Sequence, residues 1–289
     1  MNLSGNIGGA LWILLSCLLF SSMGAVAKTL GEELSSFEVA FARALFGFLW
    51  VLPIAVREGP GIWRTAHPMK HFSRIVIGST AMLCGFYALT HIPLAEATAI
   101  SFTKPLFLVI FAALILHEKV RVRRWTATAI GLIGVLVMLR PGVEVIQWAA
   151  IIGIVSAIAA AAVSILIKQL VLTEKNTTTL LYMGLGSTLI AAVPASFTWI
   201  TPNLYQVGLM AVMGALGVTG QWAMMMGFRL GEASALAPFD YARLPFAAFY
   251  GFVIFSEIPS IYTVIGTLII VCSTLYIARR EAQLHNRPS

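Results

Sequence analysis

The stretch PLAEATAI (residues 93–100) returns almost unchanged as RLGEASAL at residues 229–236. From Leu94 and from Leu230 onward, seven consecutive positions carry identical or closely similar residues, and the offset is close to half of the 289-residue chain. Each copy keeps one carboxylate among apolar neighbours, Glu96 in the first and Glu232 in the second. A repeat at this separation indicates that the chain consists of two related halves.

The composition predicts a polytopic membrane protein. The chain is 59% hydrophobic and 11% charged, with a mean hydropathy of +0.89, whereas a soluble domain is about 25% charged. The net charge of +7 comes from basic residues in short loops between apolar runs, which is a topology signal and not a nucleic-acid surface. The three cysteines each lie alone in an apolar run and form no metal-binding or disulfide pattern.

Hydropathy and the short, proline-containing connections between apolar runs predict ten transmembrane helices. A helix of about 20 residues crosses a hydrocarbon core of about 30 Å. The predicted spans are 7–27, 36–56, 73–91, 94–116, 123–140, 147–170, 178–200, 205–228, 233–256 and 259–278. A cytoplasmic N-terminus leaves only Lys28 and Arg140 in far-side loops, places Arg43, Lys104 and Arg243 inside spans, and puts the other lysines and arginines on the cytoplasmic side. This bias favours an N-in, C-in topology.

The repeat then has a structural meaning. Two copies of five spans lie in opposite orientations because five is odd, so we expect residues 1–142 and 143–289 to form two inverted five-helix repeats. Inverted repeats are typical of secondary transporters, whose substrate site lies near the membrane midplane where the halves meet. The fold class expected is therefore an all-α membrane bundle around a central cavity.

The chain resembles the EamA-type carriers of the drug/metabolite transporter superfamily. In the first half the resemblance rests on IPLAEATAISFTKPLFLVIFAALILHEKV (92–120) and GLIGVLVMLRPG (131–142); in the second half it rests on EASALAPFDYARLPFAAFYGFVIFSEIP (232–259). It implies ten helices in two inverted repeats and transport of small metabolites. The form APFDYARL (237–244) is similar to a subgroup that includes carriers proposed for S-adenosylmethionine and related metabolites.

Four charged side chains lie well inside predicted spans and are candidate substrate ligands: Arg43, Lys104, Asp240 and Arg243. Intramembrane charge costs roughly 2.5–3.5 kcal/mol on insertion scales, so it is retained mainly for function. We expect the cations to hold an anionic group of the substrate and Asp240 to hold a cationic group or a proton. The alternative is a structural ion network, and for Arg43 it is simple neutralisation by Glu38.

The two repeated acids have two interpretations. Glu96 and Glu232 each fall in the first turn of a span, where the helix N-terminus stabilises a carboxylate. The alternative is gating or proton coupling, because a partly buried glutamate can titrate near neutral pH.

Aromatic and helix-breaking residues add to the candidate site. Rings expected near the cavity are Tyr87, Phe102, Trp222, Phe239 and Tyr241. Prolines that interrupt spans four and nine are Pro105, Pro238 and Pro245, and they predict kinked or partly unwound helices there. Glycines that permit close helix approach are Gly131, Gly134, Gly214, Gly217 and Gly220.

These features predict a secondary carrier of amino acids or related zwitterions, with export favoured, in the inner membrane. Carriage of S-adenosylmethionine-like or other metabolites is the alternative within this class, and a non-transporting membrane scaffold is the alternative outside it. No catalytic constellation, nucleotide-binding loop or metal motif is recognisable, so no enzyme activity and no cofactor are expected. The expected partners are a small-molecule substrate and the lipid bilayer, and a homodimer is left open.

Overall fold

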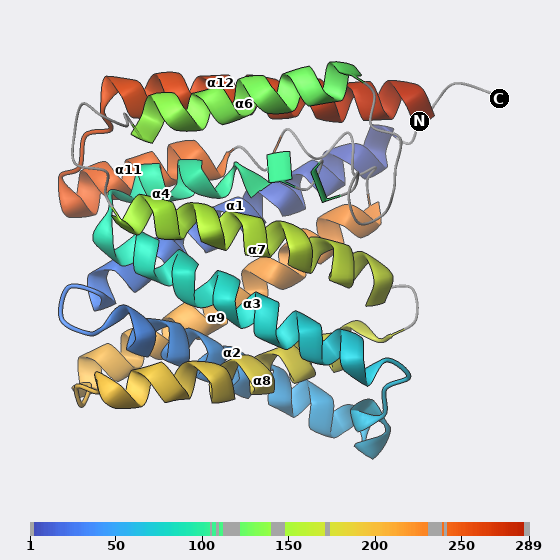
Figure 1. The fold of residues 1–289 in the computed structure, drawn as a ribbon. Helices are drawn as coiled ribbons and strands as arrows, with labels where there is room; N and C mark the ends of the chain where they lie inside the picture. Colours follow the sequence, from blue (N-terminus) through green and yellow to red (C-terminus); the bar gives the residue numbers. More distant parts are fainter. Residues whose placement is uncertain are drawn as a thin grey trace.

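The computed structural model describes residues 3–104, 106–107, 110–111, 122–139, 148–170, 174–230, 239 and 242–285. Over these residues the backbone forms α-helices and one short 3-10 helix, and it forms no strand. The helices run back and forth across the molecule, roughly parallel or antiparallel to one another (Figure 1). This arrangement suits a lipid environment because helices satisfy their backbone hydrogen bonds internally.

The described elements follow the predicted spans in order. Their bounds are α1 Leu3–Leu30, α2 Ser36–Glu58, η1 Pro60–Trp63, α3 Pro68–His91, α4 Leu94–Ser101, α6 Val122–Leu139, α7 Trp148–Leu170, α8 Asn176–Phe197, α9 Leu204–Leu230, α11 Arg243–Phe255 and α12 Ile261–His285. Each predicted span overlaps one of these α-helices. Among the described residues, six helices are long and apolar enough to cross a membrane. Shorter apolar helices occupy Thr128–Val137, Arg243–Phe255 and Ile261–Ser273.

The packing between helices has a twofold character. Taking α1, α2, α3, α4 and α6 as the first five helices and α7, α8, α9, α11 and α12 as their counterparts, α1 packs on α9 as α7 packs on α3. Likewise α1 packs on α11 as α7 packs on α4, and α2 packs on α9 as α8 packs on α3. The pairs α2–α8, α4–α11 and α6–α12 each join an element to its own counterpart. The internal repeat in the sequence is therefore repeated in the contacts.

The counterpart pairs organise the bundle in space. In Figure 1, α6 and α12 lie together along one edge and α2 and α8 lie together along the opposite edge. Helices α1, α3, α4, α7, α9 and α11 lie between these two pairs. The charged candidates that the structure describes come from α2, from the segment after α4 and from the start of α11.

Two sets of contacts identify the two ends of the bundle. At one end, which we call the Lys28 end, Ser35 after α1 bonds Thr198 after α8, and Lys28 bonds Ile92 between α3 and α4. At the other, the Glu174 end, Glu174 after α7 accepts a hydrogen bond from Thr65 between α2 and α3. Each of these contacts joins helix ends or loops that the predicted topology puts on the same side.

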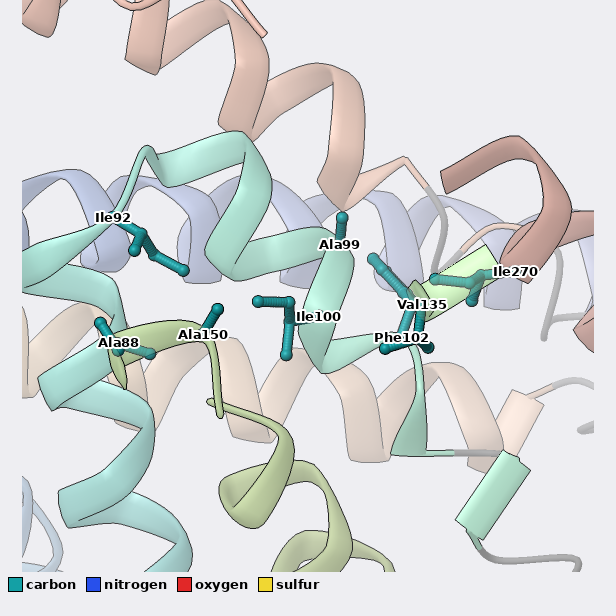
Figure 2. Close-up of a cluster of buried hydrophobic side chains, with 9 residues drawn as sticks. Ala88, Ile92, Ala99, Ile100, Phe102, Val135, Ala150 and Ile270 are labelled. Carbon is teal, nitrogen blue, oxygen red and sulfur yellow. The ribbon is translucent and has the colours of Figure 1, made fainter. Parts of the chain in front are cut away.

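A buried apolar cluster holds α4 in place (Figure 2). It joins α3, α4, α6, α7 and α12 through Ala88, Ile92, Ala99, Ile100, Phe102, Val135, Ala149, Ala150 and Ile270. Ile100 lies near Ala150 of α7, while Phe102 lies beside Val135 and Ile270. The end of α4 is thereby fixed to both repeats.

The predicted break in span four is confirmed by the described residues. Helix α4 ends at Ser101, and the next residues make turn-type hydrogen bonds, from Phe102 N to Ala99 O and from Thr103 N to Ile100 O. The Thr103 hydroxyl also donates to Ile100 O at 2.7 Å. Since Pro105 offers no N–H for a continuing helix, the span predicted as one helix over 94–116 starts with a helix of only two turns.

Candidate functional site

Arg43 lies on α2 where this helix meets α1 and α9. Its side chain is half-buried, and its Nε donates to the Met23 sulfur on α1 at 3.3 Å. The guanidinium also lies against Gly47 of its own helix and Gly217 of α9. A thioether is a weak acceptor, and within the part of the chain that the structure describes no carboxylate pairs with this guanidinium.

The interpretation that Glu38 neutralises Arg43 is wrong. The Glu38 side chain is almost fully buried, and its two oxygens accept hydrogen bonds from the backbone N–H groups of Ser35 and Ile200, at 3.1 and 2.8 Å. Glu38 N in turn donates to the Ser35 hydroxyl, which completes a capping box at the start of α2. The carboxylate is committed to the helix terminus and does not pair with Arg43.

Arg243 is the first residue of α11 and is also half-buried. Its guanidinium carbon lies 4.9 Å from the centre of the Phe20 ring on α1, a cation–π contact. Its carbonyl oxygen accepts a hydrogen bond from the Ser21 hydroxyl at 3.2 Å. Phe20 and Met23 are three residues apart on α1, so Arg243 and Arg43 contact neighbouring positions on the same helix.

A polar stripe on α1 joins this helix to α9 and α11, and the sequence analysis did not single it out. The Ser16 hydroxyl donates to Gly220 O of α9 at 2.8 Å. The Ser22 hydroxyl lies 2.8 Å from the Tyr250 hydroxyl of α11. Hydroxyl groups at intervals within an apolar span are the signal that points to such interhelical bonds.

Lys104 and its neighbours lie just beyond the end of α4. Lys104 is half-buried, whereas Phe102 is only 6% exposed and packs inside the apolar cluster described above. Tyr87 is half-buried against the same cluster, and its ring stacks on His91 with centroids 4.1 Å apart. Phe102 and Tyr87 therefore both contact the apolar cluster that holds α4, Phe102 as a buried member and Tyr87 from its margin.

The remaining candidate residues from the sequence analysis lie elsewhere in the fold or outside the described residues. Trp222 is 53% exposed and meets Trp12 edge-on, with ring centroids 5.3 Å apart. Glu96 lies in the first turn of α4, as predicted, and is half-buried. Asp240, Tyr241 and Glu232 lie outside the described residues.

Two charged clusters at the ends of the bundle were also missed. At the Lys28 end, Lys28 Nζ lies 2.6 Å from Glu257 Oε1, and Leu94 N donates to Glu257 Oε2 at 2.8 Å. At the Glu174 end, the buried ring of His71 has Nε2 4.0 Å from Glu174 Oε1. The partners in each pair are far apart in the sequence, so no local pattern identifies them.

Arg74 is a buried cation that the sequence analysis did not single out as a candidate. It lies within α3, is 7% exposed, and its Nη1 donates to Thr179 O of α8 at 2.8 Å. Metal ligands do not gather anywhere in the described residues: no group of three histidine, cysteine, aspartate or glutamate side chains there is placed to hold an ion. Among the four charged side chains predicted to lie well inside spans, the structure describes two arginines and a lysine, residue types that can bind anionic groups.

Comparison with known proteins places this fold among transporters. The profile of the EamA-like transporter family matches twice, over residues 7–140 and 147–279. The S-adenosylmethionine uptake transporter of Rickettsia prowazekii (strain Madrid E) is 34% identical over 275 residues, which are 95% of this chain and 94% of that protein. The riboflavin transporter of Rhizobium johnstonii is 29% identical over 284 residues, covering 97% of this chain and 94% of that protein.

Two further similarities extend this result. The pseudopaline exporter CntI of Pseudomonas aeruginosa (strain UCBPP-PA14) is 28% identical over 276 residues, 94% of this chain and 96% of that protein. One solved crystal structure superposes with a TM-score of 0.64 at 18% identity, over 94% of this chain and 98% of that chain. The last similarity concerns the fold alone.

Proposed function

This chain belongs to the EamA-like transporter family, and from that membership we propose that it is a secondary carrier of small zwitterionic metabolites: amino acids or compounds built on one. The family and the named relatives are transporters, which points away from an enzyme. The proposal concerns the substrate and the residues that bind it.

The observation that carries the proposal is the environment of Arg43. Its guanidinium lies within a predicted span, and the only hydrogen bond it makes to a described residue is with a sulfur atom. A cation in the membrane without an anion is costly. A substrate carboxylate would supply a negative charge that none of the described residues gives Arg43, and arginine can bind it through two parallel hydrogen bonds.

The second cation of the site, Arg243, supports the same substrate class. Arg43 and Arg243 contact neighbouring residues on α1, and Lys104 follows the break after α4. We propose that these three cations attract the carboxylate, while Asp240, which lies outside the described residues, binds the substrate ammonium. We further propose that Tyr87, Phe102, Trp222 and Tyr241 contribute aromatic surface to the site, although the contacts of Trp222 and Phe102 lie on different helices.

S-adenosylmethionine is the first solute to test. It carries an α-amino acid group, so it presents the carboxylate and the ammonium that this site requires. Its uptake is the named activity of a relative that is 34% identical over nearly the whole chain. Simple amino acids present the same group without the nucleoside.

The proposed mechanism is alternating access between two inverted repeats, residues 1–142 and 143–289, in a ten-span, N-in, C-in bundle of the inner membrane. The twofold packing pattern and the two family matches support this arrangement. Rocking of one half against the other would open the site to one side and then to the other. Export, favoured in the sequence analysis, stays a prediction because the named relatives include both an uptake carrier and an exporter. Coupling or gating by Glu96 and Glu232 also stays a proposal.

Counterflow in liposomes tests the function. Vesicles preloaded with unlabelled S-adenosylmethionine should take up the labelled solute with saturation, and Arg43→Leu should raise the KM by about tenfold or more. Arg57→Leu is a matched control, because Arg57 is an exposed arginine in the last turn of the same helix. Counterflow of decarboxylated S-adenosylmethionine should be unchanged by Arg43→Leu, since this compound lacks the carboxylate that Arg43 is proposed to bind.

Each outcome decides between named alternatives. Counterflow of S-adenosylmethionine that is unchanged in Arg43→Leu would keep the carrier and remove Arg43 from the site. Counterflow of labelled methionine alone would assign the chain to simple amino acids. Failure of every solute in a panel of amino acids, S-adenosylmethionine and riboflavin would favour the scaffold alternative.

A further inference from the structure

Gly217 on α9 faces the charged group of Arg43 directly. A methyl group built at Gly217 would lie 2.6 Å from Arg43 Nε, 2.8 Å from Cζ and 3.0 Å from Nη2. The central carbon is as near as the two nitrogens, so the methyl would stand over the flat face of the guanidinium and not beside its edge. The face therefore rests on bare backbone, while the N–H groups point outward along the edges.

A second glycine limits the guanidinium from its own helix. A methyl at Gly47 would lie 3.0 Å from Arg43 Nη1. Nε is directed to the Met23 sulfur on α1. The fork is thus held between α2, α9 and α1, and Nη1 and Nη2 make no hydrogen bond to a described residue. These terminal nitrogens are the pair that binds a carboxylate in two parallel bonds.

Other glycines on α9 have different surroundings. A methyl at Gly214 would lie 2.9 Å from the backbone carbon of Phe46 and 3.0 Å from the backbone nitrogen of Gly47, so Gly214 lets α2 and α9 approach each other. Gly208 has no neighbouring atom within 4 Å of the same position. Gly217 differs from both, because the three nearest atoms are all in the movable end of one charged side chain.

We propose that Gly217 is a positioning residue for substrate binding: it sets where the Arg43 guanidinium lies, and thereby which carboxylate geometry the carrier accepts. The proposal rests on the proposed function, in which Arg43 binds the substrate carboxylate. Arginine has a flexible stem, so an alanine at 217 displaces the guanidinium instead of separating the helices. The displaced guanidinium keeps its charge and loses its alignment with the carboxylate. In enzymes, a misplacement of about 1 Å can lower the reaction rate by about 100-fold.

Counterflow of labelled S-adenosylmethionine tests this role with matched variants. Gly217→Ala should raise the KM by about tenfold with little change in the maximal rate, whereas Gly208→Ala should match the wild type. In an Arg43→Leu background, Gly217→Ala should add nothing, because its effect passes through Arg43. Equal KM values for wild type and Gly217→Ala, with Arg43→Leu impaired, would overturn the inference and leave the proposed function intact.

A second measurement needs no transported substrate. Phenylglyoxal modifies accessible guanidinium groups, and peptide mass spectrometry gives the rate at each arginine. Gly217→Ala should change the rate at Arg43 severalfold while the rate at Arg57 stays constant, and Gly208→Ala should change neither. An unchanged rate at Arg43 would overturn the inference, even if S-adenosylmethionine proved not to be a substrate.

Folding of the variants is also informative. If Gly217→Ala alone folds poorly, the double variant Arg43→Leu/Gly217→Ala should recover, since removal of the guanidinium leaves room for the methyl. Recovery would support the contact between the two residues. A double variant that folds as poorly as Gly217→Ala would show that the methyl clashes with the helices themselves, and the positioning role would be wrong.

Discussion

The two ends of the bundle hold their loops together with different chemistry. At the Lys28 end, a lysine and a glutamate form a close ion pair that is also bonded to the backbone of Ile92 and Leu94. At the Glu174 end, the carboxylate accepts hydrogen bonds from Thr65 Oγ1 and Ala66 N, at 2.6 and 3.0 Å. His71 Nε2 lies 4.0 Å from the Glu174 carboxylate, and the histidine ring is charged only when protonated.

The twofold packing relates other contacts at these ends. Glu33, in the loop after α1, accepts a hydrogen bond from Gln206 at the start of α9. Exchanging each helix for its counterpart maps this contact onto Glu174, in the loop after α7, and the segment before α3 that holds Thr65. Each repeat therefore uses an acid after its first helix to hold the other repeat.

The two ends differ in where the charge is paired. At the Lys28 end, the ion pair between Lys28 and Glu257 is largely buried. At the Glu174 end, the buried carboxylate of Glu174 bonds neutral donors, and the pair between Lys175 and Glu58, at 3.6 Å, is the more exposed one.

The largest expected effect is at the Lys28 end. Lys28→Met should lower the free energy of unfolding by about 2–3 kcal/mol, because it leaves Glu257 partly buried without its cation. The side chains of Lys28 and Glu257 are only 12% and 20% exposed. Unfolding in mixed detergent micelles measures the change. The double variant Lys28→Met/Glu257→Gln should recover part of the loss, and absence of any recovery would contradict the ion-pair explanation.

A smaller effect is expected at the Glu174 end. Glu174→Gln should destabilise the fold by about 1–1.5 kcal/mol, because hydrogen bonds to a charged acceptor become bonds to a neutral one. The same unfolding assay applies, with Glu58→Gln as a control for a more exposed carboxylate at this end, which accepts from Thr177 and lies 3.6 Å from the exposed Lys175. A loss as large as that of Lys28→Met would mean that the two ends are fastened equally.

Removal of one helix cap should cost less again. Ser35→Ala removes the hydroxyl that accepts from Glu38 N and bonds Thr198, and caps of this kind contribute about 1 kcal/mol. The expected result is a modest fall in Tm with transport retained. Ser35→Thr keeps the hydroxyl and should restore most of the Tm; failure to do so would attribute the effect to packing.

The smallest expected effect is a difference in acid sensitivity. The hydrogen bond from Thr65 chiefly holds the pKa of Glu174 below its ordinary value, helped by Ala66 N–H and by His71 and His67 nearby, while burial acts in the opposite direction. A lowered folded-state pKa stabilises the protein above the unfolded value of about 4.5, and this stabilisation disappears as the pH falls through the folded pKa. From pH 7 to 4 the Tm of the wild type should therefore fall slightly more than that of Glu174→Gln. Parallel curves would remove Glu174 from the acid response.

Particular residues show how far the sequence could predict this structure. The break after Ser101 was predictable because proline removes a backbone donor at a known position. The close approach at Gly134 was equally predictable, and a methyl there would lie 2.9 Å from Gly266 O of α12. Arg43 was recognisable as a charge within an apolar helix, but Glu38 as its partner was wrong, because that carboxylate caps its own helix and bonds Ile200.

By itself the sequence determined that this is a membrane protein of two related halves, that its chain is helical, and that charged residues occur within apolar segments. These properties follow from local hydropathy, helix-breaking residues and internal similarity, all of which can be read directly from the amino-acid sequence. Only the tertiary structure decided that Arg43 lies between Met23 and Gly217, and that Lys28 meets Glu257. Partners of this kind depend on how helices distant in sequence pack together, and no local pattern contains that information.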